Sequence, residues 1–398
     1  MGEDVKGAGE VSRVPALPEG NRHKCQVTAL PNLPLANPSN LTAAAQTLTG
    51  LLLYCRPGFE KECAAEIQAR LQALSIEGYA KARPGSGFVV FTPYDPASLP
   101  RLYQKLRFGE LIFARQLVFV QPQLTELPAA DRITPLLAAA RVQARQYSEI
   151  LLETADTNEA KELSVFVRKF TAPFERAVRQ AGLTGQPSAP RLHLFFIDSA
   201  TVYVGLSRPG NSSSWPMGIP RLKLPRSAPS RSTLKLDEAF LVFLGNNPRN
   251  LSPGMSAVDL GAAPGGWTWQ LVKRSIRVTA VDNGPVDREL LDSGIVEHVR
   301  ADGFRYRPPK PVDWLVCDMV EQPARIAALV ARWIADGHCR HSIFNLKLPM
   351  KKRHQEVERC REIIARYLDD TEVPFRLAFK QLYHDREEVT GYLSREAG

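Results

Sequence analysis

Two lysines and two carboxylates in the carboxy-terminal half are placed where they could transfer a proton. Asp318 and Lys347 each stand at the end of an apolar run typical of a buried strand. Lys235 lies in a predicted helix before the first strand of this half, and Glu388 precedes the last strand. A lysine at the end of a buried strand costs free energy unless it is paired, so we expect the four side chains to share one crevice. The spacing alone fits a structural ion-pair network equally well.

Such a crevice could serve methyl transfer to an alcohol. The hydroxyl must lose its proton as it attacks the methyl group, and the neutral amine of a lysine could accept that proton. Partial burial and a second cation nearby should lower the pKa of such a lysine, while the carboxylates orient its amine. The transfer needs in-line positioning within about 3–3.5 Å and no metal. The cysteines and histidines also lack zinc-finger spacing, so we expect no metal site.

A glycine-rich turn, DLGAAPGG, spans residues 259–266 between a predicted strand and a predicted helix. Glycines there let the backbone approach a ligand closely and lead into a helix amino terminus. Asp282 and Asp302 follow the next two strands, where one could accept ribose hydroxyls and the other an adenine amino group. The turn lacks the G-x-G-x-x-G pattern that admits a pyrophosphate, and Pro264 stiffens it. This favours S-adenosyl-L-methionine over NAD, with a structural turn and incidental acids as the alternative.

These residues need a sheet that brings them to one edge. Residues 230–398 alternate strand-like and helical patterns, which is typical of a parallel, Rossmann-like α/β domain. The predicted strands are 256–260, 277–281, 296–299, 313–317, 342–346, 376–381 and 389–393.

The residues before 208 form two smaller predicted units that we expect to pack as one half. Residues 51–122 show the order β-α-β-α-β of an α+β, ferredoxin-like module. Residues 123–207 form the second unit, with helices at 133–147 and 159–180 and strands at 149–155, 192–197 and 201–206. Residues 1–50 contain five prolines and no aromatic residue, so we expect a disordered or loosely ordered leader.

The chain is basic, with 51 Lys and Arg against 42 Asp and Glu and a net charge of +9. Residues 200–236 contain no acid, and within them 208–229 form a predicted basic linker. Charge of one sign repels itself without a partner, so we expect phosphates to contact this stretch; a solvated basic loop is the alternative. Six scattered cysteines without a C-x-x-C pair, and no apolar run near the roughly 18 residues of a membrane span, indicate a reduced, cytoplasmic protein.

Several motifs together resemble a known family. The segments SRSTLKLDE (230–238), DLGAAPGGW (259–267), Cys317-Asp318 and Asn345-Leu-Lys347 resemble the heat-shock-type ribosomal RNA ribose 2′-O-methyltransferases. The resemblance is closer still to the ribosomal RNA large subunit methyltransferase M family. That closer resemblance is carried by CRPGFEKEC (55–63), ADTNEAKE (155–162), MGIPRLK (217–223), VDNGP (281–285), LKLPMKKR (346–353) and QLYHDREEVT (381–390). It covers roughly residues 51–393 and leaves out 1–50.

The resemblance implies S-adenosyl-L-methionine as cofactor and a seven-stranded sheet whose last strand is antiparallel. It also implies a THUMP-like RNA-binding domain at 123–207. Its catalytic tetrad would be Lys235, Asp318, Lys347 and Glu388, with Lys347 as the proton acceptor. Its cofactor contacts would be Ser232, Ala263, Pro264, Gly265, Gly266, Asp282, Asp302 and Asp318. Ala263 stands where some relatives have a cysteine, and backbone contacts there would survive the change.

The resemblance further implies one target, a cytidine ribose in the peptidyl-transferase loop of 23S ribosomal RNA. We expect that RNA as partner before subunit assembly is complete, no membrane partner, and a monomer. The expected RNA contacts are Arg221, Lys223, Arg226, Arg231, Lys351, Lys352 and Arg353.

Three other functions are weighed against this one. An RNA-binding ribosome assembly factor with a degenerate methyltransferase fold would not bind S-adenosyl-L-methionine. A nicotinamide oxidoreductase is disfavoured by the missing G-x-G-x-x-G pattern. A base methyltransferase would not need the two lysines.

Overall fold

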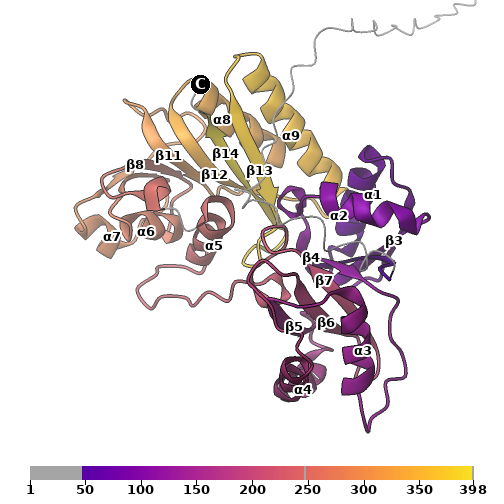
Figure 1. Cartoon of the computed structure of the whole chain (residues 1–398). Helices are drawn as coiled ribbons and strands as arrows, with labels where there is room; N and C mark the ends of the chain where they lie inside the picture. The colour runs from indigo at the N-terminus through magenta and orange to yellow at the C-terminus, as the bar shows by residue number, and fades with distance from the viewer. Residues whose placement is uncertain (1–46, 246–247, 397–398) are drawn as a thin grey trace, which may run out of the picture.

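The computed structural model describes residues 47–245 and 248–396, which form two sheets, one in each half of the chain (Figure 1). The predicted leader lies mostly outside these residues, but its last residues belong to the first sheet. Leu48 is buried, Thr49 N–H donates to Val120 O at 2.8 Å, and the first strand begins at Gly50. The leader prediction is wrong for these residues, because their backbone extends the hydrogen bonding between the first strand and its neighbour at Val120.

The amino-terminal sheet has the strand order β2-β3-β1-β4-β7-β6-β5. Its first unit consists of β1 (Gly50–Cys55), α1 (Glu60–Ala73), β2 (Gly78–Ala82), β3 (Phe88–Pro93), α2 (Leu99–Lys105) and β4 (Ala114–Val120). The predicted order therefore lacked one strand, β2. This strand lies at the sheet edge with no buried residue, so it has no apolar run to reveal it.

The second unit completes the same sheet. It consists of α3 (Ile133–Gln143), β5 (Glu149–Thr154), α4 (Lys161–Gln180), β6 (Arg191–Phe196) and β7 (Val202–Ser207). Strand β7 pairs with β4 through Phe119–Leu206 and Val120–Gly205, so the two units share one sheet and pack as one half. The linker that follows contains one short 3₁₀ turn, Pro216–Gly218, before the next helix.

The carboxy-terminal sheet has the order β10-β9-β8-β11-β12-β14-β13, and β14 runs antiparallel to both neighbours. Its strands are β8 (Ser256–Leu260), β9 (Arg277–Val281), β10 (Val296–Val299), β11 (Val312–Cys317), β12 (Cys339–Lys347), β13 (Phe375–Lys380) and β14 (Glu388–Arg395). Its helices are α5 (Thr233–Leu244), α6 (Gly266–Val272), α7 (Arg288–Asp292), α8 (Pro323–Ala335) and α9 (Arg353–Asp369). The predicted Rossmann-like class with an antiparallel last strand is confirmed; α7 was not predicted.

Successive side chains of β11, the middle strand of this sheet, pack on opposite faces. Trp314 and Val316 pack with α5 and α6 on one face, and Leu315 packs with α8 and α9 on the other. This follows from the two-residue period of a strand covered on both faces. The layered arrangement leaves the carboxyl ends of β8, β11 and β12 together at one edge.

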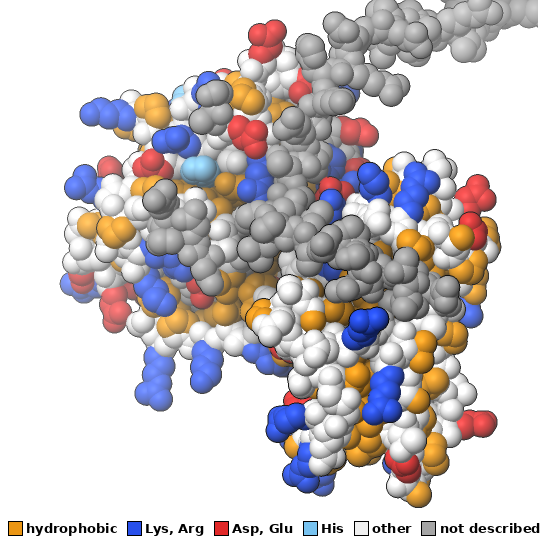
Figure 2. Space-filling model, viewed as in Figure 1, with side chains coloured by type: hydrophobic (Ala, Val, Ile, Leu, Met, Phe, Trp, Pro, Cys, Tyr) orange, Lys and Arg blue, Asp and Glu red, His pale blue; other side chains and the backbone are white. Residues whose placement is uncertain are grey.

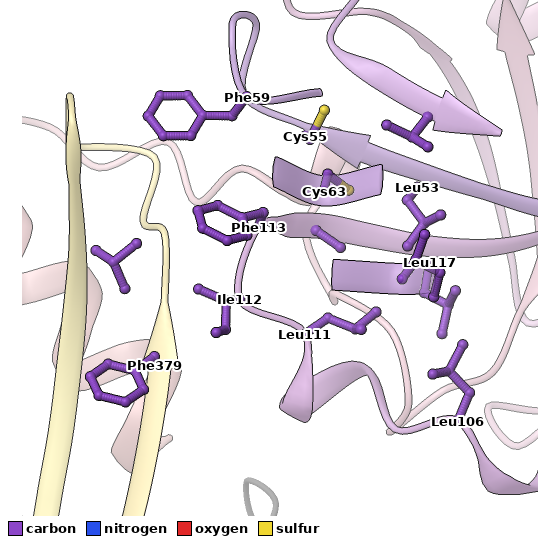
Figure 3. Packing of buried hydrophobic residues seen from close by; sticks show 14 of the residues in the cluster. Leu53, Cys55, Phe59, Cys63, Leu106, Leu111, Ile112, Phe113, Leu117 and Phe379 are labelled. Carbon is purple, nitrogen blue, oxygen red and sulfur yellow. The ribbon is translucent and has the colours of Figure 1, made fainter. Parts of the chain in front are cut away.

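A continuous hydrophobic core joins the two halves. Figure 3 shows Ile112 and Phe113 of the amino-terminal half on one side and Phe379 of β13 on the other, all in one buried cluster. Gln381 N–H donates to Ile112 O at 2.9 Å, and the buried ammonium of Lys380 donates to Leu111 O at 2.7 Å. The loop that leads to β14 is therefore held from the amino-terminal half.

Candidate active site at the junction of the two halves

The four charged residues singled out in the sequence meet at one edge of the carboxy-terminal sheet. Asp318 follows β11, and Lys347 ends the parallel neighbour β12. Glu388 begins β14 and lies opposite Lys347 in the antiparallel register. Lys235 reaches the same place from the first turn of α5. Strand order thus brings together residues that are far apart in the chain.

The four side chains form an alternating ring of charge. Lys347 Nζ lies 2.7 Å from Asp318 Oδ1 and 2.9 Å from Glu388 Oε1. Lys235 Nζ lies 2.6 Å from Glu388 Oε2 and 3.5 Å from Asp318 Oδ2. Each lysine contacts one oxygen of each carboxylate, and the four side chains are 13–21% exposed. Little water competes for these groups, while a substrate can still reach them.

The balance of charges corrects one sequence-based expectation. Burial lowers the pKa of Lys347, but the carboxylates of Asp318 and Glu388 raise it more, and the net pKa lies above the ordinary value. Burial and a second cation nearby predict a lowered pKa from the sequence alone. The register places two carboxylates within hydrogen-bonding distance of Lys347, and their effect on its pKa outweighs burial. Lys347 is therefore an ammonium in this state of the protein.

A buried polar chain behind the ring was missed from the sequence. Asn345 Nδ2 donates to Asp318 Oδ1 at 2.9 Å and to Glu388 Oε2 at 3.1 Å, so it fixes the two carboxylates relative to each other. The hydroxyl of Thr390 lies 2.7 Å from Asn345 Oδ1 and 3.0 Å from Asp385 Oδ2. The sequence signal is weak: Asn345 stands between the apolar Phe344 and Leu346, and Thr390 follows the apolar Val389.

Counting protons on this chain indicates the state of Asp385. The threonine hydroxyl has one proton to donate, and Asn345 Oδ1 can only accept. If Thr390 donates to Asn345, its contact with Asp385 requires a proton on the acid. Burial, with the nearby charge of Glu388, raises the pKa of Asp385 well above its ordinary value. Both observations indicate a neutral Asp385 carboxyl that donates to Thr390.

The glycine-rich turn is built as a cradle without room for side chains. Gly265, the residue before α6, has a φ of 118°, and Gly261 has a φ of 79°. A Cβ on Gly266 would lie 2.2 Å from the hydroxyl oxygens of both Ser230 and Ser232. Such a backbone can approach a ligand closely, and α6 points its amino terminus at the same place.

The acids expected to hold a nucleoside differ in their surroundings. Asp282 follows β9 and accepts from Ala263 N–H at 3.0 Å and Gly284 N–H at 2.7 Å, so it braces the cradle. Each of its oxygens keeps a second lone pair for a ligand hydroxyl. Asp302 is more open, with a side chain that is 52% exposed, a bond from Phe304 N–H at 2.9 Å, and an ion pair to Arg305.

Asp259, within the turn motif, also has a carboxylate oxygen that a ligand could bind. Its Oδ2 accepts from the Thr268 hydroxyl at 2.6 Å, while its buried Oδ1 has no partner among the described residues. Burial, together with the charges of Asp318 and Asp282, raises the pKa of Asp259 to about 7. A buried oxygen without a partner among the described residues, close enough to two further carboxylates to feel their charge, suits a cationic donor. The cradle and these acids therefore fit S-adenosyl-L-methionine, which carries ribose hydroxyls and an ammonium group.

A crevice of about 610 Å³ opens in front of Lys235 and Glu388, and the amino-terminal half forms its other wall. Arg56, Arg115 and Asp156 from that half line it together with Arg231, Tyr383 and Arg386. Arg56 Nη1 donates to Asp385 O at 2.7 Å, so a residue from the first strand–helix turn supports the loop before Glu388. These amino-terminal residues were not predicted, because nothing in their spacing shows which edge of the other domain they meet.

Six of the seven basic residues expected to contact RNA are exposed: Arg221, Lys223, Arg226, Arg231, Lys351 and Lys352. Figure 2 shows Lys and Arg side chains along the lower edge of the carboxy-terminal half, where Figure 1 places the linker. Arg353 is different, because its side chain is only 15% exposed. Its guanidinium stacks over the Phe59 ring at 4.2 Å and pairs with Glu62 and Glu387. These contacts join the two halves of the chain, and the RNA contact of Arg353 stays a prediction.

Two further findings concern other kinds of site. Within residues 47–245 and 248–396, no group of three or more His, Cys, Asp or Glu side chains could hold a metal ion. Among the helices of the same residues, none is both long and apolar enough to cross a membrane.

Comparisons with known proteins match almost the whole described chain. Residues 48–118 match a family model described as the RlmM ferredoxin-like domain, 131–208 match "Ribosomal RNA large subunit methyltransferase M, N-terminal", and 228–342 match an FtsJ-like methyltransferase. The Ribosomal RNA large subunit methyltransferase M of Methylococcus capsulatus is 62% identical, over 87% of this chain and 98% of that protein. The protein of the same name from Cellvibrio japonicus is 54% identical, over 86% and 98%.

Proposed function

Because the chain belongs to the ribosomal RNA large subunit methyltransferase M family, we propose that it methylates the ribose 2′-hydroxyl of one cytidine in the peptidyl-transferase loop of 23S ribosomal RNA. The chain is an S-adenosyl-L-methionine-dependent methyltransferase that acts on ribosomal RNA. The observation that carries the 2′-hydroxyl assignment is the ring of two lysines and two carboxylates beside the cradle.

Each residue of the site has a proposed task. Bound S-adenosyl-L-methionine supplies a methyl group on a sulfonium, whose positive charge opposes the ammonium form of Lys347. Residues Ala263 to Gly266 and Asp282 hold the nucleoside part, with Ser232 beside them. Lys347, once neutral, accepts the proton of the ribose hydroxyl. Asp318 and Glu388 aim its amine and stabilise the ammonium that forms.

Lys235 has a different task from Lys347. It shares both carboxylates with Lys347 and lines the crevice. A second cation here limits how strongly the carboxylates hold a proton on Lys347, because like charges disfavour each other. Lys235 is also placed to meet the ribose or a neighbouring phosphate of the RNA. We assign proton acceptance to Lys347 because its position opposite Glu388 ties it to two rigid strands.

The RNA is proposed to lie across both halves. The crevice walls come from the two halves together, and basic residues of the linker stand exposed beside it. Residues 123–207 would act as a THUMP-like RNA-binding domain. We further propose a cytoplasmic monomer that acts on 23S ribosomal RNA before the large subunit is complete.

Two measurements test the proposal. Ribose methylation is mapped on total RNA from cells with and without this gene, and one cytidine of the peptidyl-transferase loop should lose its mark. Purified protein is then given labelled S-adenosyl-L-methionine and 23S RNA transcript. Labelling on a base, or on no RNA despite cofactor binding in equilibrium dialysis, would contradict the proposal. Without cofactor binding, the degenerate assembly factor would be the better account.

A further inference from the structure

A second cavity adjoins the crevice and has no task in the mechanism above. It encloses about 160 Å³ between the two halves, and we call it the side cavity; it is lined by Arg107, Phe108, Trp215, Lys380, Gln381 and Tyr383, among others. Arg115 and Tyr383 line both the side cavity and the crevice. The Arg115 guanidinium lies 5.2 Å from the centre of the Tyr383 ring, so this stacked pair stands between the two spaces.

The walls of the side cavity suit a flat ring. Phe108 and Trp215 supply aromatic surface, and Leu241 and Leu382 add apolar surface. A cavity of roughly 150 Å³ accommodates a single aromatic ring. Bases of unpaired RNA are held in this way, by aromatic and guanidinium faces.

Three of the polar side chains that line the side cavity have buried atoms without a partner among the described residues. Gln381 is 2% exposed, and neither its amide oxygen nor its amide nitrogen has a partner among the described residues. Arg107 Nη1 and Arg115 Nε are also buried without a partner among the described residues. Leaving buried donors and acceptors unmatched costs free energy, which a ligand with a complementary edge recovers. An amide offers one donor and one acceptor side by side, and a nucleobase edge presents the matching pair.

The charge of the side cavity favours an electron-rich or anionic ligand. Arg107, Arg115 and Lys380 line it, and Glu238 is the acid among its lining residues. The Glu238 carboxylate is already engaged, because it accepts from Tyr383 N–H at 2.8 Å, His384 N–H at 2.9 Å and the His384 ring at 2.6 Å. Arg115 is already paired with Asp156 at 3.4 Å, so Arg107 and Lys380 leave the net positive charge that attracts a phosphate-linked base.

The crevice also adjoins a third space. There a hollow of about 500 Å³ shares Pro57 and Asp156 with the crevice and is lined by Asn158, Lys161 and Arg221. An RNA strand at Lys235 and Glu388 therefore has two adjoining spaces for its neighbouring nucleotides. Three adjoining spaces suit three consecutive nucleotides of an unpaired strand.

We propose that the side cavity binds the base of a nucleotide next to the methylated one, with the Gln381 amide pairing to its edge. The inference rests on the proposed function and adds that the substrate is read as an unpaired strand with one neighbouring base inserted. Gln381 then determines specificity at that neighbouring position.

The test uses the full-length protein and an RNA fragment that carries the target loop. An abasic nucleotide replaces each neighbour of the target cytidine in turn, and kcat/KM for methyl transfer is measured for wild type and Gln381→Leu. At one neighbour position, the abasic change should lower wild-type kcat/KM about tenfold or more. Gln381→Leu should lower activity on intact RNA, with little further loss on the abasic RNA. Gln186→Leu, at an exposed glutamine, serves as the control and should behave as wild type.

A second measurement does not depend on turnover. 5-Iodouridine is placed at each neighbour position, and the RNA is crosslinked by light to the Lys347→Met variant. Crosslinks to Phe108 or Trp215, which line the side cavity but not the crevice, support the proposal when they come from one position. The proposal is overturned if neither abasic change lowers kcat/KM, or if crosslinks form only outside the side cavity. It is also overturned if the fold-losses in kcat/KM from Gln381→Leu and from the abasic change multiply, because the two changes would then act independently. If wild type methylates no RNA while these crosslinks form, the proposed function fails and the binding site stands.

Discussion

The ammonium of Lys347 lies 2.7 Å from Asp318 Oδ1, although 29 positions separate the two residues in the chain. They meet because β11 and β12 are parallel neighbours that end at the same edge of the sheet. The same carboxylate is held by Lys235 and Asn345 from other directions. The proton acceptor of the proposed reaction is therefore positioned by a rigid network that exists before substrate binds.

Replacing Lys347 should remove proton acceptance while leaving cofactor binding intact. We expect Lys347→Met to lower the rate of methyl transfer by about 10²–10⁴-fold, the usual contribution of a general base. Lys347→Arg should be equally impaired, because a guanidinium cannot lose its proton at working pH. Single-turnover transfer of labelled methyl measures the rate, and equilibrium dialysis measures cofactor binding. Rapid transfer by either variant would remove Lys347 from its proposed task.

The rate should rise with pH. The carboxylates of Asp318 and Glu388 outweigh burial and raise the pKa of Lys347, so below that pKa the ammonium predominates and only the small neutral fraction can accept a proton. That fraction grows about tenfold for each pH unit below the pKa. We expect single-turnover rates to increase from neutral to alkaline pH, with the residual rate of Lys347→Met nearly flat. A wild-type rate that falls over this range would contradict the assignment.

Asp385 should tolerate replacement by an amide. If its carboxyl is neutral and donates to Thr390, Asp385→Asn keeps a donor at the same place, and both activity and stability at pH 7 should be preserved. A raised pKa in the folded state means that the folded protein holds the proton more tightly than the unfolded chain. The free energy of unfolding of the wild type should therefore fall as pH rises from the unfolded-state pKa of Asp385 to its folded-state pKa. The free energy of unfolding of the variant should not show this fall. Urea unfolding at several pH values measures the difference. Thr390→Val, which breaks the chain to Asn345, should lower activity.

Arg353 should contribute to stability more than to RNA binding. Arg353→Met keeps the aliphatic stem over Phe59 but removes the pairs to Glu62 and Glu387. We expect the free energy of unfolding to fall by about 1–3 kcal/mol, as for buried hydrogen bonds to charged groups. Lys351→Met, at an exposed position, should change it little. Equal stability of the two variants, with RNA affinity reduced only by Arg353→Met, would instead make Arg353 an RNA-binding residue.

The basic linker should act through phosphates. Replacing Arg221, Lys223 and Arg226 together by alanine should weaken RNA binding and reduce its dependence on salt. For a single strand the slope of log K against log salt changes by about 0.7 for each phosphate that the protein no longer neutralises, or about 2 for three phosphates. Filter binding over a range of salt concentrations measures the slope. If the slope is unchanged, the linker does not touch the RNA backbone.

The sequence alone determined the class of the carboxy-terminal domain and the residues that carry its chemistry. Alternating apolar periods and the residues at strand ends are local features, and Asp318, Lys347 and the turn at 259–266 are recognisable from them. The edge strand β2 and the short helix α7 escaped because they bury too little to leave a pattern.

Only the tertiary structure decided what surrounds those residues. The raised pKa of Lys347, the support from Asn345 and Thr390, and the contacts of Arg353 depend on register and on packing between elements distant in the chain. So does the wall that Arg56 and Arg115 contribute to the crevice. Residue types show which charges are present, but the sign of a pKa shift depends on distances that only the folded chain sets.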